Sequence, residues 1–278
     1  MEIEICEMED MKGSFILKNS SPAMANALRR TMLTHIPKMA IDKVEFHLGP
    51  IMVDDKEYES VTPLFDEIVA HRLGMVPVPT DYGLFSFQEN CPCGGEGCPN
   101  CTIMYSLNKI GPCTVLSGDM MPLGNPDLAV KDQFIPIVEL TDGQAVLIYA
   151  TAVMGTAKKH VKWQAAFGVG YKYVPEVHID ESRAGDQDPL DSIKVCPRNV
   201  FEIKNGKLRV VDVLNCGMCR QCEVVSKGAV KIDADDTKFF FKYETDGSLT
   251  AKQVLDKATE ILSVQSEDVF AHIGEEKL

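Results

Sequence analysis

The chain has 278 residues, a length that allows two domains and a small third one. Apolar residues make up 45% and charged residues 25%, which suits a globular protein and excludes fibrous and disordered classes. The formal net charge of −13 excludes a broad nucleic-acid surface, because such surfaces need Lys and Arg to displace counterions. No run approaches the roughly 18 apolar residues of a membrane span, and the acidic start is unlike a signal peptide. We therefore expect a cytoplasmic protein with no membrane contact.

The N-terminal stretch predicts two strands and a helix. We expect strands over 2–8 and 14–18, separated by a turn. Ser21 is a suitable N-cap and is followed by a proline at the first helical position, so a helix should begin there and end before Pro37. Apolar and polar residues largely alternate over 39–48, which predicts a strand.

The middle of the chain predicts one helix and several short strands. A helix should begin at Thr62 and end at Gly74, a residue that suits a left-handed cap. Short β-like runs follow, for example 133–140 and 144–150, and residues 175–235 alternate short strands with cysteines.

Near the C-terminus we expect a strand over 239–244, a turn over 245–248 and a final helix. Thr250 and Gln253 have the spacing of a capping box at the start of that helix.

Both terminal helices carry a wide apolar stripe. The first stripe includes Leu28, and the last helix contributes Val254, Leu255, Ala258, Ile261 and Leu262. Such stripes either cover a sheet of the same chain or bind a partner, and periodicity alone does not separate these alternatives. Because the two stripes exceed what one chain needs to display, we predict a partner interface.

Seven of the ten cysteines fall into two groups, which favours metal ligation over disulfides in a chain without a secretory signal. The first group is Cys91, Cys93, Cys98 and Cys101. Its glycines let the chain fold back, and four thiolates without a nearby histidine indicate a closed structural zinc site. A flexible loop with reduced thiols is the alternative, and Cys113 could replace one ligand.

The second group contains Cys216, Cys219 and Cys222, a C-x2-C-x2-C run that suits one corner of an iron–sulfur cube. Cys196, which is followed by proline, is the candidate for the fourth ligand. In a bacterial-type ferredoxin motif a further cysteine follows such a run after three residues, but this chain has Ser226 there. The sequence therefore predicts one [4Fe–4S] cluster, with a [3Fe–4S] form as a variant. An all-cysteine zinc site and four unligated thiols remain the alternatives.

A basic stretch from Lys158 to Trp163 stands out in this acidic chain. It is either a solvated loop or a contact patch for an acidic partner, since Trp and basic residues often anchor interfaces.

Three motifs together are similar to one known family. They are NALRR at 26–30, HRLGMVP at 71–77 and TDGSLT at 245–250 with its closing helix. On these motifs the chain resembles the α-like assembly subunits of DNA-directed RNA polymerase, and within them the archaeal D subunits. The first cysteine group is similar to the zinc loop of the eukaryotic member, with one extra residue between Cys93 and Cys98. The second is similar to the ferredoxin-like insertion of archaeal members.

The resemblance implies an α+β fold in three parts. A discontinuous dimerisation domain, an antiparallel sheet with N- and C-terminal helices, would occupy 1–46 and 228–270. A β-rich inserted domain with the cysteine loop 91–101 would occupy 47–172. The ferredoxin-like iron–sulfur domain would occupy 173–227, and 271–278 would form a tail.

The resemblance also implies a non-catalytic scaffold, active only within the polymerase, a nucleotidyltransferase. Its first and last helices would pair with subunit L, and the pair would recruit the small subunits N and P and then the large B subunit. Asn26, Arg29 and Arg30 match the docking face for the large subunit, which suits the bidentate contacts of Arg. The stretch from Lys158 to Trp163 matches a loop that faces the same subunit. Direct nucleic-acid contact would be small or absent.

Two other functions compete with this interpretation. An iron–sulfur electron-transfer protein is the main alternative, but the chain has no flavin, haem or nicotinamide motif beside its single cluster. A free-standing zinc-binding DNA module is disfavoured by the charge of −13.

Overall fold

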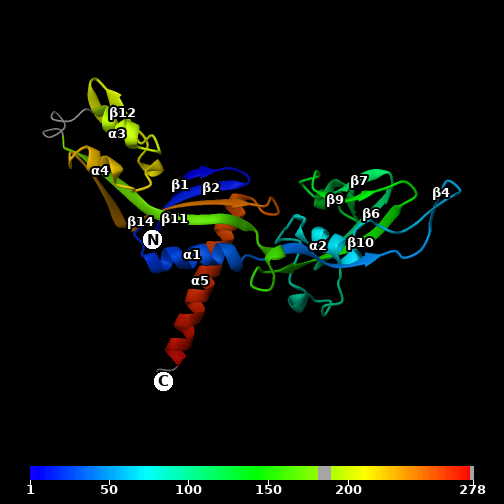
Figure 1. Ribbon diagram of the computed structural model, residues 1–278. Helices are drawn as coiled ribbons and strands as arrows, with labels where there is room; N and C mark the ends of the chain where they lie inside the picture. Colours follow the sequence, from blue (N-terminus) through cyan, green and yellow to red (C-terminus); the bar gives the residue numbers. More distant parts are fainter. Residues whose placement is uncertain (181–188, 276–278) are drawn as a thin grey trace. The chain divides into compact units, whose positions relative to one another are not determined.

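The computed structural model describes residues 1–180 and 189–275 (Figure 1). The strands are β1 (Glu2–Met8), β2 (Lys12–Lys18), β3 (Lys38–Phe46), β4 (Ile51–Val53), β5 (Lys56–Tyr58), β6 (Thr102–Ile110), β7 (Cys113–Leu116), β8 (Met120–Pro122), β9 (Pro136–Leu140), β10 (Ala145–Gly155), β11 (Ala166–Ile179), β12 (Phe201–Lys204), β13 (Lys207–Val210) and β14 (Val230–Thr245). The α-helices are α1 (Pro22–Thr34), α2 (Asp66–Met75), α3 (Pro189–Val195), α4 (Gln221–Val225) and α5 (Ala251–Glu275). None of these described helices is long and apolar enough to cross a bilayer.

Two four-stranded sheets organise most of the strands. One has the order β1-β2-β14-β11, so strands from both ends of the chain share it, and the other has the order β3-β10-β6-β8. Strand β10 pairs antiparallel with β3 and with β6, and β6 pairs antiparallel with β8. The expected α+β class, with antiparallel sheets and few helices, is confirmed in this part of the fold.

The described chain divides into two compact units, each with its own core. The first unit consists of Met1–Glu7, Ser14–Ala27 and Gly170–Lys242. On its sheet the ring of Phe15 stacks on Phe241 with centroids 4.8 Å apart, and Tyr171 lies 5.1 Å from Phe241. These aromatic contacts join β2, β11 and β14 into one packed layer.

The second unit consists of Met8–Gly13, Leu28–Val169 and Tyr243–Leu278. Its apolar core contains Leu73 of α2 together with Met39, Tyr105 and Ile148 of strands β3, β6 and β10. The cysteine loop 91–101 belongs to this unit and precedes β6 directly.

The end of α2 differs from the prediction. The helix passes through Gly74, which has no positive φ, and ends at Met75. Its C-cap is Val76, an extended residue with φ −68° and ψ 124°. Pro77 follows, and the residue before a proline is driven out of the helical region by steric clash. Proline, and not glycine, therefore ends this helix.

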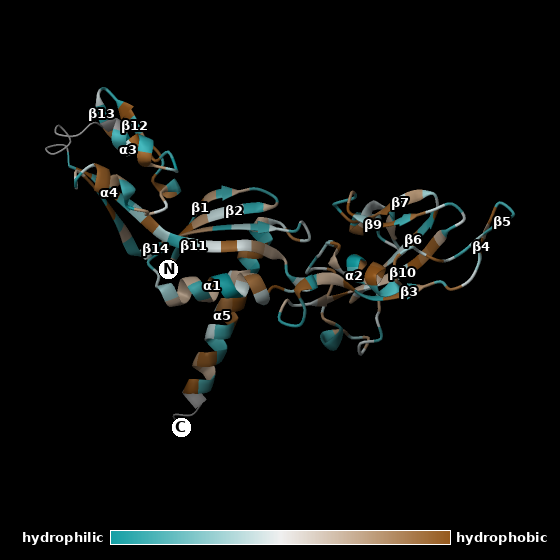
Figure 2. Ribbon diagram, viewed as in Figure 1, coloured by the Kyte–Doolittle hydropathy of each residue, from teal (hydrophilic) through white to brown (hydrophobic). Residues whose placement is uncertain are grey.

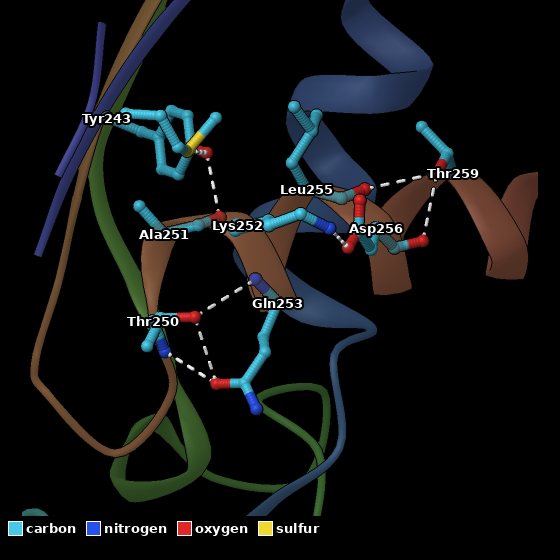
Figure 3. A network of polar contacts seen from close by, with 9 residues as sticks. Tyr243, Thr250, Ala251, Lys252, Gln253, Leu255, Asp256 and Thr259 are labelled. Atoms are coloured by element: carbon cyan, nitrogen blue, oxygen red, sulfur yellow. Dashed lines mark hydrogen bonds and ion pairs between the residues drawn. The ribbon is translucent and has the colours of Figure 1, made fainter. Parts of the chain in front are cut away.

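Helix α5 begins with the predicted capping box (Figure 3). The backbone N–H of Thr250 donates to Gln253 Oε1 at 2.9 Å, and the N–H of Gln253 donates to Thr250 Oγ1 at 3.2 Å. The hydroxyl of Tyr243 donates to the carbonyl of Ala251 at 2.8 Å. The first turn of α5 is thus tied to the end of β14.

A buried ion pair stabilises the turn between β14 and α5. The side chains of Lys38 and Asp246 are paired and only 4% and 9% exposed. Lys38 Nζ also donates to the carbonyl of Gln164 at 3.3 Å, and Asp246 Oδ1 accepts the N–H of Ser248 at 3.0 Å. Both charges are therefore satisfied by several partners, as buried ions must be.

Candidate metal centres and partner surfaces

Two tight turns build the first cysteine group. The carbonyl of Cys91 accepts the N–H of Gly94 at 3.0 Å, and the carbonyl of Cys98 accepts the N–H of Cys101 at 2.9 Å. Gly94 and Gly97 have φ of +68° and +89°, a backbone region that glycine adopts at no steric cost. The glycines between the cysteines therefore allow four thiols to converge.

The four sulfur atoms lie within 4.8 Å of one another. The Sγ–Sγ distances are 3.5 Å for Cys91–Cys98, 3.7 Å for Cys93–Cys101 and 4.0 Å for Cys98–Cys101, and all four thiols are free. A tetrahedral zinc with Zn–S bonds of about 2.3 Å needs sulfur atoms about 3.8 Å apart. An iron–sulfur cube holds its thiolates farther apart, because each binds a different iron. The geometry thus fits one tetrahedral metal ion.

The pKa values of two thiols in this group are shifted in opposite directions. Backbone N–H groups, foremost that of Cys98, lower the pKa of Cys93 to about 5. Desolvation raises the pKa of Cys101, a fully buried residue, to about 12. Neighbouring thiolates repel one another, so the group needs a bound cation to hold all four in the ionised form that ligates metal.

The second cysteine group surrounds a cavity. Cys196, Cys216, Cys219 and Cys222 all line a space of about 240 Å³. Cys196 follows α3 and Cys222 lies in α4. These two short helices therefore place Cys196 beside the three cysteines of the C-x2-C-x2-C run. In the part of the chain that the structure describes, only the first group gathers its sulfur atoms within 4.8 Å. A cavity ringed by thiols suits a ligand larger than a single ion.

The run itself is curled by residues with left-handed backbone. Met218 and Arg220 flank Cys219 and have φ of 52° and 59°. The N–H of Met218 donates to Cys216 Sγ at 3.4 Å. Burial raises the pKa of Cys222 to about 11, so this thiol ionises at neutral pH only with a cation beside it. The four sulfur donors of the second cysteine group fit an iron–sulfur cluster.

Four residues of the predicted partner stripe are buried within this chain. Leu28 is 1% exposed, Val254 and Ala258 are fully buried and Leu255 is 5% exposed. These side chains are therefore part of the buried apolar interior of this chain. Of the predicted residues of α5, Ile261 and Leu262 remain half-buried.

The exposed apolar surface of α5 begins after these residues. It consists of Val264, Val269, Phe270 and Ile273, which are 50% to 75% exposed. Figure 2 shows brown, hydrophobic bands along this half of α5. The sequence prediction ended at Leu262, although Val269 and Ile273 continue the same helical spacing.

The predicted basic contacts have different environments. Arg30 and Lys158 are exposed, whereas Asn26 and Arg29 are half-buried and already have an interaction within the chain. Lys158 is anchored through its backbone, since its N–H donates to the carbonyl of Thr34 at 3.2 Å.

Trp163, one of the predicted contact residues, is a core residue of this chain. It is 1% exposed, and its Nε1–H donates to the carbonyl of Val153 at 3.0 Å. Its ring packs on Gly155, where a Cβ would collide with it. Lys162 Nζ lies 4.3 Å from the ring centroid and pairs with Asp42 at 2.5 Å. The lysine therefore covers the tryptophan and is itself neutralised.

Comparison with known proteins gives a consistent result. A family described as the RNA polymerase Rpb3/Rpb11 dimerisation domain matches residues 14–265. DNA-directed RNA polymerase subunit Rpo3 of Thermoplasma volcanium is 43% identical over 93% of this chain and 94% of its own length. The Rpo3 subunits of Picrophilus torridus and Archaeoglobus fulgidus are each 41% identical; the first match covers 98% of this chain and 100% of the relative, and the second 99% and 98%. The chain therefore belongs to the Rpb3/Rpb11 dimerisation-domain family of RNA polymerase.

Proposed function

We propose that this chain heterodimerises with subunit L and that the pair recruits the small subunits N and P and then the large B subunit. The observation that carries this proposal is the match of a dimerisation domain over residues 14–265. As a member of this family the chain is an assembly subunit of DNA-directed RNA polymerase, so nucleotidyl transfer belongs to the complete enzyme. The experiment is co-expression with tagged subunit L, followed by addition of the other subunits. Failure to capture the chain on subunit L would refute the pairing.

The partner surface of this proposal is the C-terminal half of α5. Its four large exposed apolar residues, Val264, Val269, Phe270 and Ile273, stand among mostly polar residues in this half of the helix. Uncovered side chains of this size on one helix are typical of a subunit interface. Arg30 and Lys158 would contribute exposed positive charge toward the large subunit.

For the first cysteine group we propose one structural zinc ion. Three Sγ–Sγ distances of 3.5–4.0 Å support a tetrahedral ion, and a set of four protein ligands that leaves no open position suits a structural role. Zinc per chain, measured after dialysis, tests this assignment.

For the second group we propose one [4Fe–4S] cluster held by Cys196, Cys216, Cys219 and Cys222. Two of these, Cys216 and Cys222, are 7% exposed and lie in an apolar core with Val200, Phe201, Val230 and Ile232. A core this small gains its stability from a metal staple, so cluster binding and folding of 173–227 should be coupled. Iron and sulfide analysis of anaerobically purified protein tests the cluster.

An electron-transfer role is the second candidate, and one observation favours it. Cys219 is exposed, so one edge of the proposed cluster would lie near solvent. A carrier would show a reversible potential and exchange electrons with a soluble redox partner. A scaffold would instead co-purify in near-equal amounts with polymerase subunits whether its cluster is oxidised or reduced.

A further inference from the structure

Lys172 ties the loop that carries the cluster cysteines to the sheet of the first unit. It lies on β11, and its Nζ donates to the carbonyls of Leu214 at 2.5 Å and Cys216 at 2.7 Å. Leu214 belongs to the short 3-10 turn Val213–Asn215, and Cys216 is the first cysteine of the run. One ammonium group therefore fixes the backbone at the point where the ligand run begins.

A second lysine on the same sheet lacks this contact. Lys172 and Lys242 both lie over the ring of Phe240, at 5.8 Å and 5.3 Å from its centroid. Both line a pocket of about 370 Å³ together with Arg198. Among the described residues, however, Lys242 has no hydrogen bond to the loop over 213–217. The two lysines thus share charge and surroundings, but only Lys172 donates hydrogen bonds to the described loop over 213–217.

We propose that Lys172 is a positioning residue for the iron–sulfur site, an inference that rests on the proposed cluster. By fixing the Leu214 and Cys216 carbonyls, it sets the direction in which Cys216 Sγ points into the cavity. The same sulfur accepts the N–H of Met218 at 3.4 Å. Cys216 is therefore held at its carbonyl by Lys172 and at its sulfur by Met218. Charge-assisted hydrogen bonds of this kind are the stronger ones in proteins.

The charge of Lys172 has a second effect on the site. A cluster with four thiolate ligands is anionic, and a nearby ammonium favours its more reduced, more negative form. Removal of this charge should lower the reduction potential, whereas a lysine with a merely structural role would leave the potential unchanged.

The test compares three variants of the full chain, purified and reconstituted anaerobically with iron and sulfide. Lys172→Met removes the charge and both hydrogen bonds, Lys172→Arg keeps the charge, and Lys242→Met is the matched control. The readouts are iron per chain, the half-life of cluster absorbance in air, and the reduction potential. We expect Lys172→Met to lose its cluster roughly tenfold faster than wild type, because two hydrogen bonds to a charged group are removed. Its potential should fall, Lys172→Arg should recover part of both losses, and Lys242→Met should keep the wild-type half-life.

Three results would overturn the inference, and they are distinguishable. If iron-loaded Lys172→Met has the cluster half-life and reduction potential of wild type, the role of Lys172 is refuted, whereas the proposed cluster is not. A wild-type chain that takes up no iron would refute the cluster itself, and the positioning role with it. Equal losses in Lys172→Met and Lys242→Met would assign the effect to local charge alone and refute the contact with the loop.

Discussion

Replacing Phe270 with Asp should break the proposed pairing with subunit L without unfolding this chain. Phe270 is 75% exposed on the C-terminal half of α5. A buried Phe removes about 200 Å² from water, so covering the exposed part would bury about 150 Å², or about 4 kcal/mol at 25 cal/mol per Å². Because an interface recovers only part of such a gain, we expect the dissociation constant to rise at least about a hundredfold.

Leu255→Asp should act differently, although it lies on the same helix. Leu255 is 5% exposed, so its replacement buries an unpaired carboxylate in the core of the chain. Changes of this kind cost about 3–5 kcal/mol, a large share of the stability of a domain. The expected result is loss of folding, with loss of pairing only as its consequence.

The assay is a titration of each purified variant with tagged subunit L, together with thermal unfolding of the chain alone. Phe270→Asp should keep the wild-type Tm and lose affinity, and Leu255→Asp should show a lower Tm. The exposed residue Glu267, on the same half of α5, supplies the control Glu267→Ala, which should change neither value. Wild-type affinity of Phe270→Asp would refute the assignment of this surface to the partner.

Three further predictions concern the metal loop, the buried ion pair and the acidic limit of stability. Cys98→Ser should release about one zinc per chain and leave the iron content unchanged, because the two proposed ligand sets share no residue; loss of both metals would refute the grouping. Lys38→Met should lower the free energy of unfolding by about 3–5 kcal/mol, since it leaves the Asp246 carboxylate buried without its partner, and urea unfolding measures this. Lys238 and Thr237 lower the pKa of Asp235 to about 2, so its contribution to stability should be complete above the ordinary carboxyl pKa near 4 and be lost as the pH falls through 2. A carboxyl titration of Asp235 by NMR with a midpoint near 4 would contradict that last expectation.

The sequence predicted those elements that are determined by residues close to one another along the chain. The strand over 2–8 has the bounds of β1, and the proline at position 22 is the first residue of α1. The capping box of Thr250 and Gln253 is confirmed by its reciprocal hydrogen bonds. Spacing also grouped the first four cysteines correctly, because turns within ten residues decide whether such thiols meet.

Features that depend on distant contacts could not be predicted in this way. Trp163 has basic neighbours in sequence, and only the fold shows that Gly155 and the paired Lys162 bury it. Strand β14 starts at Val230, well before the predicted 239. The sequence did not predict this start, because the acidic residues Asp233, Asp235 and Asp236 interrupt the alternation of apolar and polar residues. Periodicity identified the apolar stripe of α5 but could not show which turns the chain covers itself.

The order of strands in the first sheet delays its completion during synthesis of the chain. Strand β2 has its neighbour β14 at the far end of the sequence, and Phe15 finds its stacking partner only at Phe241. At about 5–20 residues per second, a ribosome needs about 10–40 s to pass from Lys18 to Val230. Throughout that interval the edge of β2 that will pair with β14 has no neighbouring strand. An unpaired strand edge can pair with another chain, so newly made chains are exposed to aggregation until β14 has been synthesised.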